Sequence, residues 1–579
     1  MKYRQFILIL WLCLQLMQST AQWRIGQLQD DGSIAVNSIQ SPSHIADNNT
    51  RSAPAIKLRE GYPVIFAADP VFKNFRNVSL ADLDGDGADE IIFGVADKFF
   101  VFRADTLWWS RQLSGLARFP AAIGDLENDG IEDLVVLTGF NDDPGQIYAF
   151  NSRGIDKPGW PRDFDGRWLI SSPALADIDG DSRLEIICSD LESGFGNVHL
   201  LRSDGNSYSG NWPVTLPNVP AVTPSVGDID GDGDPEVIIA STREIYAFNL
   251  PGNVKEGWPF NNGVTKFSFQ SPILTDLEGD GLLETIIEGH GDWPLYLNLD
   301  ATGQHKEGWP KPVPQGQWTF HTPTVIQYEG SPVILTGRPI SDNTARPMLF
   351  AWRPDGSLLD GFPIVKTGGL EGLITVADID QDHQPEIIFP SNMIDSLGHG
   401  FIHAYELDGS GEVPGFPLKP YGWTFLNGAT LGDVDGNGLL DLAVLTYTEN
   451  EGSAHDSALL YVYETDAPAN DESVLWSTYK GNNLRNGNIV LGLSTSRTIH
   501  EAPQIKLFPN PTPDYLRIES NHSLHSLEIF TSTGHKISSY TDLSFRKTIN
   551  LTTLPVGVYM IKINSQGGQA QMHKIIKDQ

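Results

Sequence analysis

Cysteine is nearly absent from this sequence, which has two in 579 residues, Cys13 and Cys188. Residues 1–21 have a basic start, an apolar run and a small-residue end, so they are predicted to be a cleaved signal peptide. The bulky Leu12 argues against the alternative, a lipoprotein signal ending at Cys13. Cleavage leaves Cys188 alone, so no disulfide is expected within the mature chain. Cys188 lies in an apolar strand and is expected to be a small buried hydrophobe.

Basic residues are also scarce: 39 lysines and arginines stand against 73 acids, for a formal net charge of −34. Binding to nucleic acid needs clustered basic side chains that neutralise phosphates, so no nucleic-acid partner is expected. Beyond residue 22 no apolar run is long enough to cross a bilayer, so no transmembrane segment is expected. The sequence also lacks a G-x-S-x-G elbow, an H-E-x-x-H helix and a phosphate-binding glycine loop, and no catalytic residue is predicted.

Glycine and proline are abundant, with 57 and 38 residues, and they separate short apolar segments, a pattern that favours an all-β fold. One pattern occurs seven times: an apolar strand, an acidic loop, a further acid and then a second apolar strand. Aligned on its first acid, each loop offers side-chain oxygens at positions 1, 3, 5 and 9. These residues are Asp82, Asp84, Asp86 and Glu90; Asp125, Glu127, Asp129 and Asp133; Asp177, Asp179, Asp181 and Glu185; Asp228, Asp230, Asp232 and Glu236; Asp276, Glu278, Asp280 and Glu284; Asp378, Asp380, Asp382 and Glu386; and Asp433, Asp435, Asn437 and Asp441.

Four hard oxygens in one loop are typical of Ca²⁺ coordination, so about seven calcium sites are predicted. Asp and Gly also favour plain turns, but turn formation alone does not require a further acid at position 9 in every copy. A helical EF-hand is excluded because its closing acid falls at position 12. Position 6 is glycine except at Ser182 and His383, and those two loops are predicted to bind more weakly.

A second element, an aromatic residue followed by proline, precedes the loops at a constant phase. Its aromatic residues are Tyr62, Trp160, Trp212, Trp258, Trp309, Phe362 and Phe416. The constant phase favours packing between repeats over a sugar-binding aromatic box. Residues 322–338 continue the strand pattern with Gln327 at position 1 and a shortened loop, which makes eight repeats of about four strands each.

These loops resemble the FG-GAP/VCBS repeats of integrin-α-like β-propellers. The resemblance implies a calcium-binding propeller over residues 56–490, with eight blades or, as the alternative, seven. Either the strand after Tyr62 or the strand of Trp476 could close the ring. The polar segment 22–55 has no readable pattern.

Residues 503–579 have another character and resemble the C-terminal sorting domain of the type IX secretion system. The matching marks are Pro509-Asn510-Pro511, Gly534, Gly557-Val558-Tyr559 and the ending Lys574-Ile575-Ile576-Lys577. The resemblance implies a small β-sandwich that the type IX secretion machinery recognises as its partner. Residues 491–502 are the expected linker, and the mature protein is expected to be secreted or on the outer cell surface.

Taken together, these features predict a secreted or surface-bound, calcium-binding propeller that serves in binding or adhesion, with an unidentified extracellular protein or glycan as its ligand. The alternative is a carbohydrate-active enzyme, because some polysaccharide lyases are propellers with calcium loops. The missing catalytic cluster favours binding over catalysis.

Overall fold

The computed structural model describes most of the chain. The described residues are 23–28, 34–40, 54–69, 74, 76, 78–139, 145–164, 167–192, 194–314, 321–449, 456–491, 505–508, 510–512, 515–520, 524–531, 536–543, 546–552, 554–565 and 570–578. The predicted signal peptide, residues 1–21, lies outside this set, as does nearly all of the predicted linker. Within it the chain is all-β, as predicted, and its one helical segment is the 3-10 turn η1, Tyr479–Gly481.

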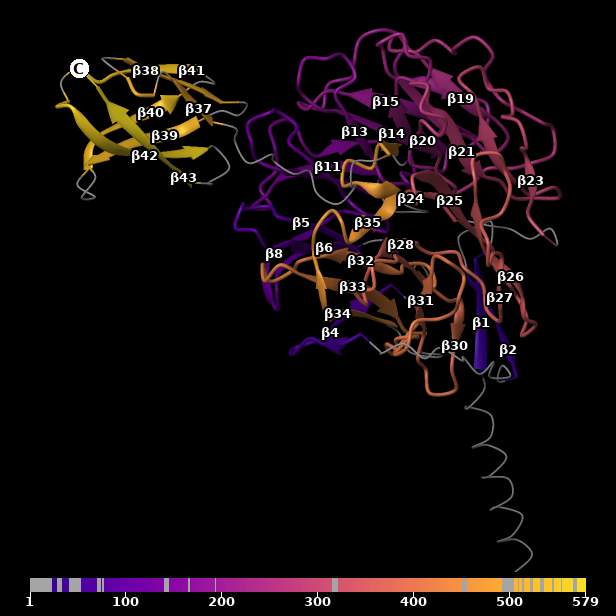
Figure 1. Ribbon diagram of the computed structural model, residues 1–579. Helices are drawn as coiled ribbons and strands as arrows, with labels where there is room; N and C mark the ends of the chain where they lie inside the picture. The colour runs from indigo at the N-terminus through magenta and orange to yellow at the C-terminus, as the bar shows by residue number, and fades with distance from the viewer. Residues whose placement is uncertain are drawn as a thin grey trace, which may run out of the picture.

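Small antiparallel sheets follow one another along the described chain, and the first four contain three or four strands each (Figure 1). The first sheet has β5 (Ser79–Ala81), β6 (Glu90–Val95), β7 (Lys98–Arg103) and β8 (Thr106–Gln112); the second β9 (Ala122–Gly124), β10 (Asp133–Thr138), β11 (Gln146–Asn151) and β12 (Arg162–Asp163); the third β13 (Ala174–Ala176), β14 (Glu185–Glu192), β15 (Phe195–Leu201) and β16 (Val214–Leu216); and the fourth β17 (Ser225–Gly227), β18 (Glu236–Ala240) and β19 (Ile245–Phe248).

The next four sheets repeat this order, and the fifth, seventh and eighth include strands from distant parts of the chain. The fifth sheet has β20 (Ile273–Thr275), β21 (Glu284–Glu288), β22 (Leu295–Leu299), β23 (Lys311–Pro312) and β36 (Asn488–Ile489); the sixth β24 (Thr324–Tyr328), β25 (Ser331–Gly337), β26 (Arg346–Trp352) and β27 (Ile364–Lys366); the seventh β28 (Thr375–Ala377), β29 (Glu386–Pro390), β31 (Ile402–Glu406) and β35 (Val474–Trp476); and the eighth β32 (Ala429–Gly432), β33 (Leu439–Tyr447), β34 (Asp456–Pro468), β3 (Lys57–Leu58) and β4 (Val64–Ala68).

Burial falls from the first two strands of a sheet to the fourth. All residues of β5 and β6 are buried, whereas β8 is exposed or half-buried along its length. A strand buried on both faces needs a continuous apolar run, and the sequences of β6, β10 and β18 have this pattern. Cys188 lies in such a strand, β14, and is fully buried, as predicted.

Aromatic residues of the aromatic-proline elements join each sheet to the next one. The indole nitrogens donate hydrogen bonds to backbone carbonyls of the following sheet: Trp160 to Ser203 at 2.8 Å, Trp258 to Ala301 at 3.0 Å and Trp309 to Pro354 at 2.7 Å. These side chains are 7% exposed. The prediction that the aromatics pack between repeats is therefore confirmed.

The succession of sheets returns to its start. The first strands of the eighth and first sheets, β32 and β5, are in contact. The Thr430 hydroxyl donates to the Val78 carbonyl at 2.9 Å, and the Asp433 amide donates to the Asp89 carboxylate at 2.9 Å. These bonds connect segments more than 340 residues apart in sequence.

The strand that follows Tyr62 completes the eighth sheet. β4 pairs antiparallel with β34, with Phe66 opposite Ala458. The strand of Trp476, β35, instead pairs with β28 at the inner edge of the seventh sheet. Of the two candidates for closing the ring, the structure thus selects the N-terminal one.

A segment that we call the central segment, residues 473–489, runs between the first strands of the sheets. Its backbone carbonyls accept hydrogen bonds of 2.7 to 2.9 Å from those strands or the residues beside them; the donor and acceptor pairs are Asp378 and Ser473, Leu431 and Ser477, Ile123 and Asn483, Leu175 and Leu484, Val226 and Asn486, and Leu274 and Gly487. In Figure 1 its strand β35, orange, lies among β24, β28 and β32. Its Lys480 and Arg485 are 1% and 0% exposed, so the chain itself fills the middle of the ring of sheets.

Part of the polar segment 22–55 forms a hairpin. β1 (Trp23–Leu28) pairs antiparallel with β2 (Ile34–Ile39) and also with β30 (Met393–Ile394). The Asn392 amide donates to the Gly26 carbonyl at 2.9 Å. Because β30 lies in the connection between β29 and β31, the hairpin pairs with a part of the seventh sheet's chain.

The C-terminal part of the chain forms two further sheets, shown apart from the rest in Figure 1. One has β37 (Ile505–Phe508), β38 (Tyr515–Ser520) and β41 (Arg546–Asn550), and the other has β39 (Leu524–Thr531), β40 (Lys536–Leu543), β42 (Gly557–Ser565) and β43 (Ala570–Lys577). Leu516 and Ile518 of the first pack with Ile529 and Ile561 of the second in a separate core. This arrangement is the small β-sandwich that the sequence predicted.

Candidate metal centres

Each acidic loop joins the first two strands of its sheet, and its first acid holds the loop in shape. In the loop between β17 and β18, one Asp228 oxygen accepts the amides of Gly231 at 2.8 Å and Asp232 at 3.1 Å. Its other oxygen accepts the amide of Gly233 at 2.8 Å. Gly231 and Gly233 have φ values of 72° and 95°, which a glycine adopts without steric cost.

The two loops without glycine at position 6 keep this geometry. Ser182 and His383 have φ values of 70° and 69° and still donate their amides to the first acid, at 2.9 Å to Asp177 and 3.1 Å to Asp378. A non-glycine residue in this region is strained by about 1 kcal/mol. The prediction that these two loops bind an ion more weakly stays a prediction.

The acid at position 9 is the buried end of every loop. Its carboxylate accepts the amide of position 2, as in Glu90 from Leu83 at 2.7 Å and Glu386 from Ile379 at 2.7 Å. Both acids are at most 2% exposed. Burial raises the pKa of Glu90 to about 7 and the pKa of Glu386 to about 10. A plain turn does not need a buried carboxylate, so these acids distinguish the loops from ordinary Asp-Gly turns.

Five of the loops bring at least three carboxylates together among the described residues. In each group one oxygen per residue lies within 4.8 Å of the others. The groups are Asp82, Asp84 and Asp86; Asp177, Asp179 and Glu185; Asp228, Asp230 and Glu236; Asp378, Asp380, Asp382 and Glu386; and Asp433, Asp435 and Asp441. Only carboxylates converge in these groups, a set of hard oxygens that suits a divalent cation such as Ca²⁺.

The other two loops, at Asp125 and Asp276, do not form such a group in the described chain, although their acids occupy the same positions. The sixth sheet has only a tight turn, Glu329-Gly330, between β24 and β25, as expected for the repeat with the shortened loop.

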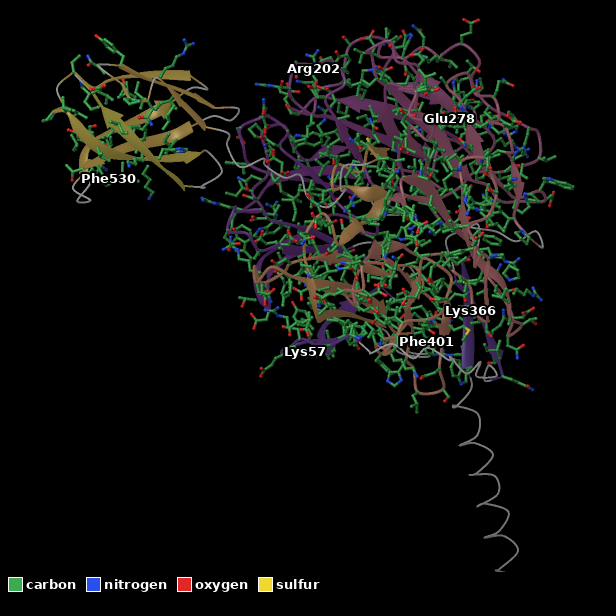
Figure 2. All side chains as sticks on the ribbon, viewed as in Figure 1. Lys57, Arg202, Glu278, Lys366, Phe401 and Phe530 are labelled. Atoms are coloured by element: carbon green, nitrogen blue, oxygen red, sulfur yellow. The ribbon has the colours of Figure 1, made fainter. Side chains whose placement is uncertain are left out.

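Basic side chains that the sequence analysis did not single out reach into five loops. Lys255 pairs with Asp230 and Glu236, and Lys306 pairs with Glu278, labelled in Figure 2, and with Glu284. The remaining contacts are Lys157 with Glu127 and Asp133, Arg103 with Asp84 and Glu90, and Arg59 with Asp435. Four of these residues stand three positions before the aromatic residue of an aromatic-proline element, a spacing that could have revealed them.

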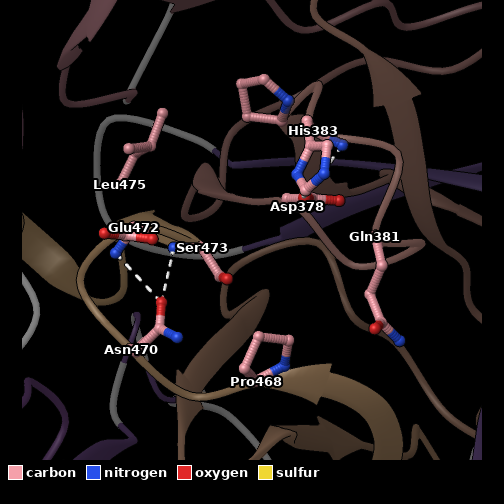
Figure 3. Close-up of a pocket in the computed structure, with 9 residues that line it drawn as sticks. Asp378, Gln381, His383, Pro468, Asn470, Glu472, Ser473 and Leu475 are labelled. Atoms are coloured by element: carbon pink, nitrogen blue, oxygen red, sulfur yellow. Dashed lines mark hydrogen bonds and ion pairs between the residues drawn. The ribbon is translucent and has the colours of Figure 1, made fainter.

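A hollow of about 270 Å³ lies beside the Asp378 loop (Figure 3). Asp378 and His383 line one side, and Asn470 and Ser473 line the other. The Asn470 side-chain oxygen accepts the Ser473 amide at 3.0 Å. This lining is more polar than that of most small-molecule pockets, which are chiefly apolar.

Comparison with known families agrees with these features. Residues 125–188 match the FG-GAP-like repeat, and residues 506–578 match the secretion system C-terminal sorting domain. The chain thus carries an FG-GAP-like repeat and a type IX sorting domain, as the sequence predicted. The sorting domain indicates export by the type IX secretion system to the cell surface or outside, and implies contact with that machinery. No helix in the described part of the chain is long and apolar enough to cross a membrane.

No curated protein sequence matches the chain. Among solved structures, the biofilm matrix protein Bap1 of Vibrio cholerae is similar, with 14% identity, coverage of 76% of this chain and 96% of that one, and a TM-score of 0.38. The BP39L lectin of Burkholderia pseudomallei has 12% identity, 60% and 99% coverage and a TM-score of 0.40. PorZ of Porphyromonas gingivalis has 11% identity, 96% and 90% coverage and a TM-score of 0.25. Likenesses this distant carry no conclusion about function.

Proposed function

We propose that this protein is a calcium-binding, eight-bladed β-propeller that type IX secretion delivers to the cell surface or the medium, where it binds an extracellular protein or glycan. Residues 56–490 are the propeller and residues 503–579 the sorting domain. Residues 1–21 are the signal peptide, and the sorting domain is removed within the linker 491–502.

Two features support eight blades. Each of the eight sheets has its own first strand, and the contact between β32 and β5 brings the last sheet beside the first. In addition, β4 from the N-terminal part of the chain completes the eighth sheet, so that both ends of the repeat region contribute to one blade. Closure of this kind leaves no unpaired sheet at the end of the series.

The observation that carries the binding role is the filled centre of the ring. Enzymes and small-molecule carriers enclose their ligand in a concave site. Here the central segment occupies the middle, with Lys480 and Arg485 buried among the first strands. The loops at the rim of a rigid β scaffold are left to contact a partner, which is how binding modules of this kind work.

The test uses the mature protein recovered from the medium or the cell surface. Immobilised extracellular proteins and polysaccharides are screened for saturable binding, and the same polysaccharides are assayed for ultraviolet-absorbing unsaturated products. We expect saturable binding to one class of ligand without new products, and heat-unfolded protein serves as the control. Appearance of unsaturated sugars from an acidic polysaccharide would instead support the lyase alternative.

A further inference from the structure

We propose that six of the seven acidic loops are of two kinds: the Asp378 loop binds a divalent cation, whereas basic side chains of the protein itself take the place of the ion in the five loops that they reach. The proposal leaves the Asp177 loop aside. This inference rests on the proposed calcium-binding function and restricts it to fewer loops than the sequence suggests.

The Lys255 ammonium lies between two of the acids that would share an ion. Its nitrogen is 2.7 Å from Asp230 at position 3 and 2.6 Å from Glu236 at position 9. In the next sheet Lys306 is 2.8 Å from Glu278 and 3.1 Å from Glu284, the acids at the same two positions. An ammonium donates up to three hydrogen bonds, and a calcium ion needs the same oxygens. The two cations therefore compete for one place.

The lysines are held in the loops by burial. The side chains of Lys157, Lys255 and Lys306 are 10%, 16% and 19% exposed. Lys157 contacts Glu127 and Asp133, again at positions 3 and 9. Buried carboxylates are costly unless a cation pairs with them, and these ammonium groups supply that charge without a metal.

Arginines contact loop acids in two further sheets. Arg103 contacts Asp84 and lies 3.2 Å from Glu90, and Arg59 lies 2.9 Å from Asp435. Arg59 belongs to the N-terminal segment that completes the eighth sheet, so closing the ring also brings the charge to that loop.

The position of the lysine in the repeat shows where this charge is missing. Lys157, Lys255 and Lys306 each precede the tryptophan of an aromatic-proline element by three residues. At the matching position the third sheet, which carries the Asp177 loop, has Ser209, the sixth sheet, which has no acidic loop, has Leu359, and the seventh sheet has Val413. The seventh sheet thus keeps its four acids without the lysine.

The Asp378 loop contains the buried oxygens that a cation would satisfy. It is the group in which four carboxylates, Asp378, Asp380, Asp382 and Glu386, converge within 4.8 Å. Glu386 is fully buried, and one of its oxygens accepts the Ile379 amide at 2.7 Å. Its other oxygen and one oxygen of Asp378 are buried without a hydrogen bond in the described structure. In the fourth and fifth sheets the matching glutamate oxygen is the one that a lysine contacts.

Glu386 also stands opposite a second buried acid, Glu406, in the pairing of β29 with β31. Two buried carboxyl groups therefore occupy neighbouring positions at this end of the seventh sheet. A divalent cation bound by hard oxygen ligands is the partner that such a site fits.

The experiment counts calcium ions by native mass spectrometry on the mature protein, with circular dichroism to verify folding. Glu386→Gln and, as a second variant at a more exposed acid of the same loop, Asp380→Asn should each lose one ion relative to the wild type. Lys306→Met frees the Asp276 loop and should gain one ion. Lys311→Met, in β23 of the same sheet and outside the loop, is the matched control and should leave the count unchanged.

Several outcomes would overturn the proposal. They are seven ions in the wild type, an unchanged count in folded Glu386→Gln and Asp380→Asn, and no gain in Lys306→Met. Seven ions would contradict the division of the loops while leaving the calcium-binding propeller intact. Absence of any calcium from a folded wild-type protein that still binds its ligand would remove the metal sites but not the binding role.

Discussion

The guanidinium of Arg485 donates a hydrogen bond of 2.6 Å to the hydroxyl of Ser79, which lies 406 positions earlier in the chain. Ser79 begins β5, the first strand of the first sheet. The same guanidinium donates to the Ala121 carbonyl at 3.1 Å, beside the second sheet, and to the Tyr479 carbonyl at 2.7 Å. One side chain of the central segment thus joins the first two sheets to each other.

The first prediction is that Arg485→Met destabilises the protein strongly. Arg485 is 0% exposed, and its loss leaves several buried acceptors without donors. We expect a loss of about 3–5 kcal/mol in the free energy of unfolding. Urea denaturation measures it. The control is Arg153→Met at an exposed position, which should change the free energy by less than about 0.5 kcal/mol. Equal effects of the two substitutions would show that the central segment does not stabilise the ring.

The sequence could predict what depends on local pattern. The acidic loops, the alternation of strands and the marks of the sorting domain are each short sequence patterns, and where they fall on described residues the structure has strands and turns. The buried acid at position 9 was also recognisable, because it recurs directly before an apolar strand.

Pairings between strands that lie far apart in the sequence have no such local signal. β35 reads like another outer strand of a repeat, yet Trp476 pairs with Val376 at an inner edge. Nothing in the local sequence distinguishes an inner edge from an outer one, since both need an apolar strand. The basic residues in the loops were missed because they lie outside the loop pattern. Lys157, Lys255 and Arg103 lie 13 to 30 residues from the acids that they contact, and Arg59 lies 376 positions from Asp435.

The second prediction concerns the aromatic links between sheets. Trp258→Phe keeps most of the buried ring but loses the hydrogen bond of 3.0 Å to the Ala301 carbonyl, so we expect a loss of about 1 kcal/mol. Trp258→Ala also leaves a cavity and should lose about 3–5 kcal/mol. The matched controls are Trp293→Phe and Trp293→Ala, since Trp293 is 63% exposed. These two substitutions should change the free energy of unfolding little. A Trp258 series no more destabilising than the Trp293 series would contradict a role in joining the sheets.

The third prediction concerns pH in the absence of calcium. Burial raises the pKa of Glu185 to about 7 from its ordinary value of 4.5. The folded protein then holds a proton that the unfolded chain has lost, so stability is fully present below about pH 4.5 and is lost as the pH rises to about 7. With a chelator present, the melting temperature should fall from pH 5 to pH 7 and then level off.

The matched variants for this prediction lie on one strand, β14. Glu185→Gln removes the titrating group and should make the fall shallower, whereas Glu192→Gln at the exposed end should leave it unchanged. Added calcium should raise the melting temperature most above pH 7, where the carboxylates are charged and ready to coordinate it. A melting temperature that is independent of pH and of chelator would contradict both the buried acids and the structural role of calcium.

The last prediction concerns export. Residues 574–577 form the end of β43, where Ile575 pairs with Tyr559 of β42 and is fully buried in the core of the tail. Deleting residues 574–579 removes this pairing and exposes the core, so the tail should no longer be recognised and the protein should accumulate in the periplasm. Deleting residues 578–579 alone leaves β43 whole and is the matched control, for which export should continue.

Immunoblots of periplasm and medium measure the distribution of the protein. The intact mass of the exported protein should give a C-terminus within residues 491–502. Exported protein that still ends at Gln579 would show that the tail is retained rather than removed.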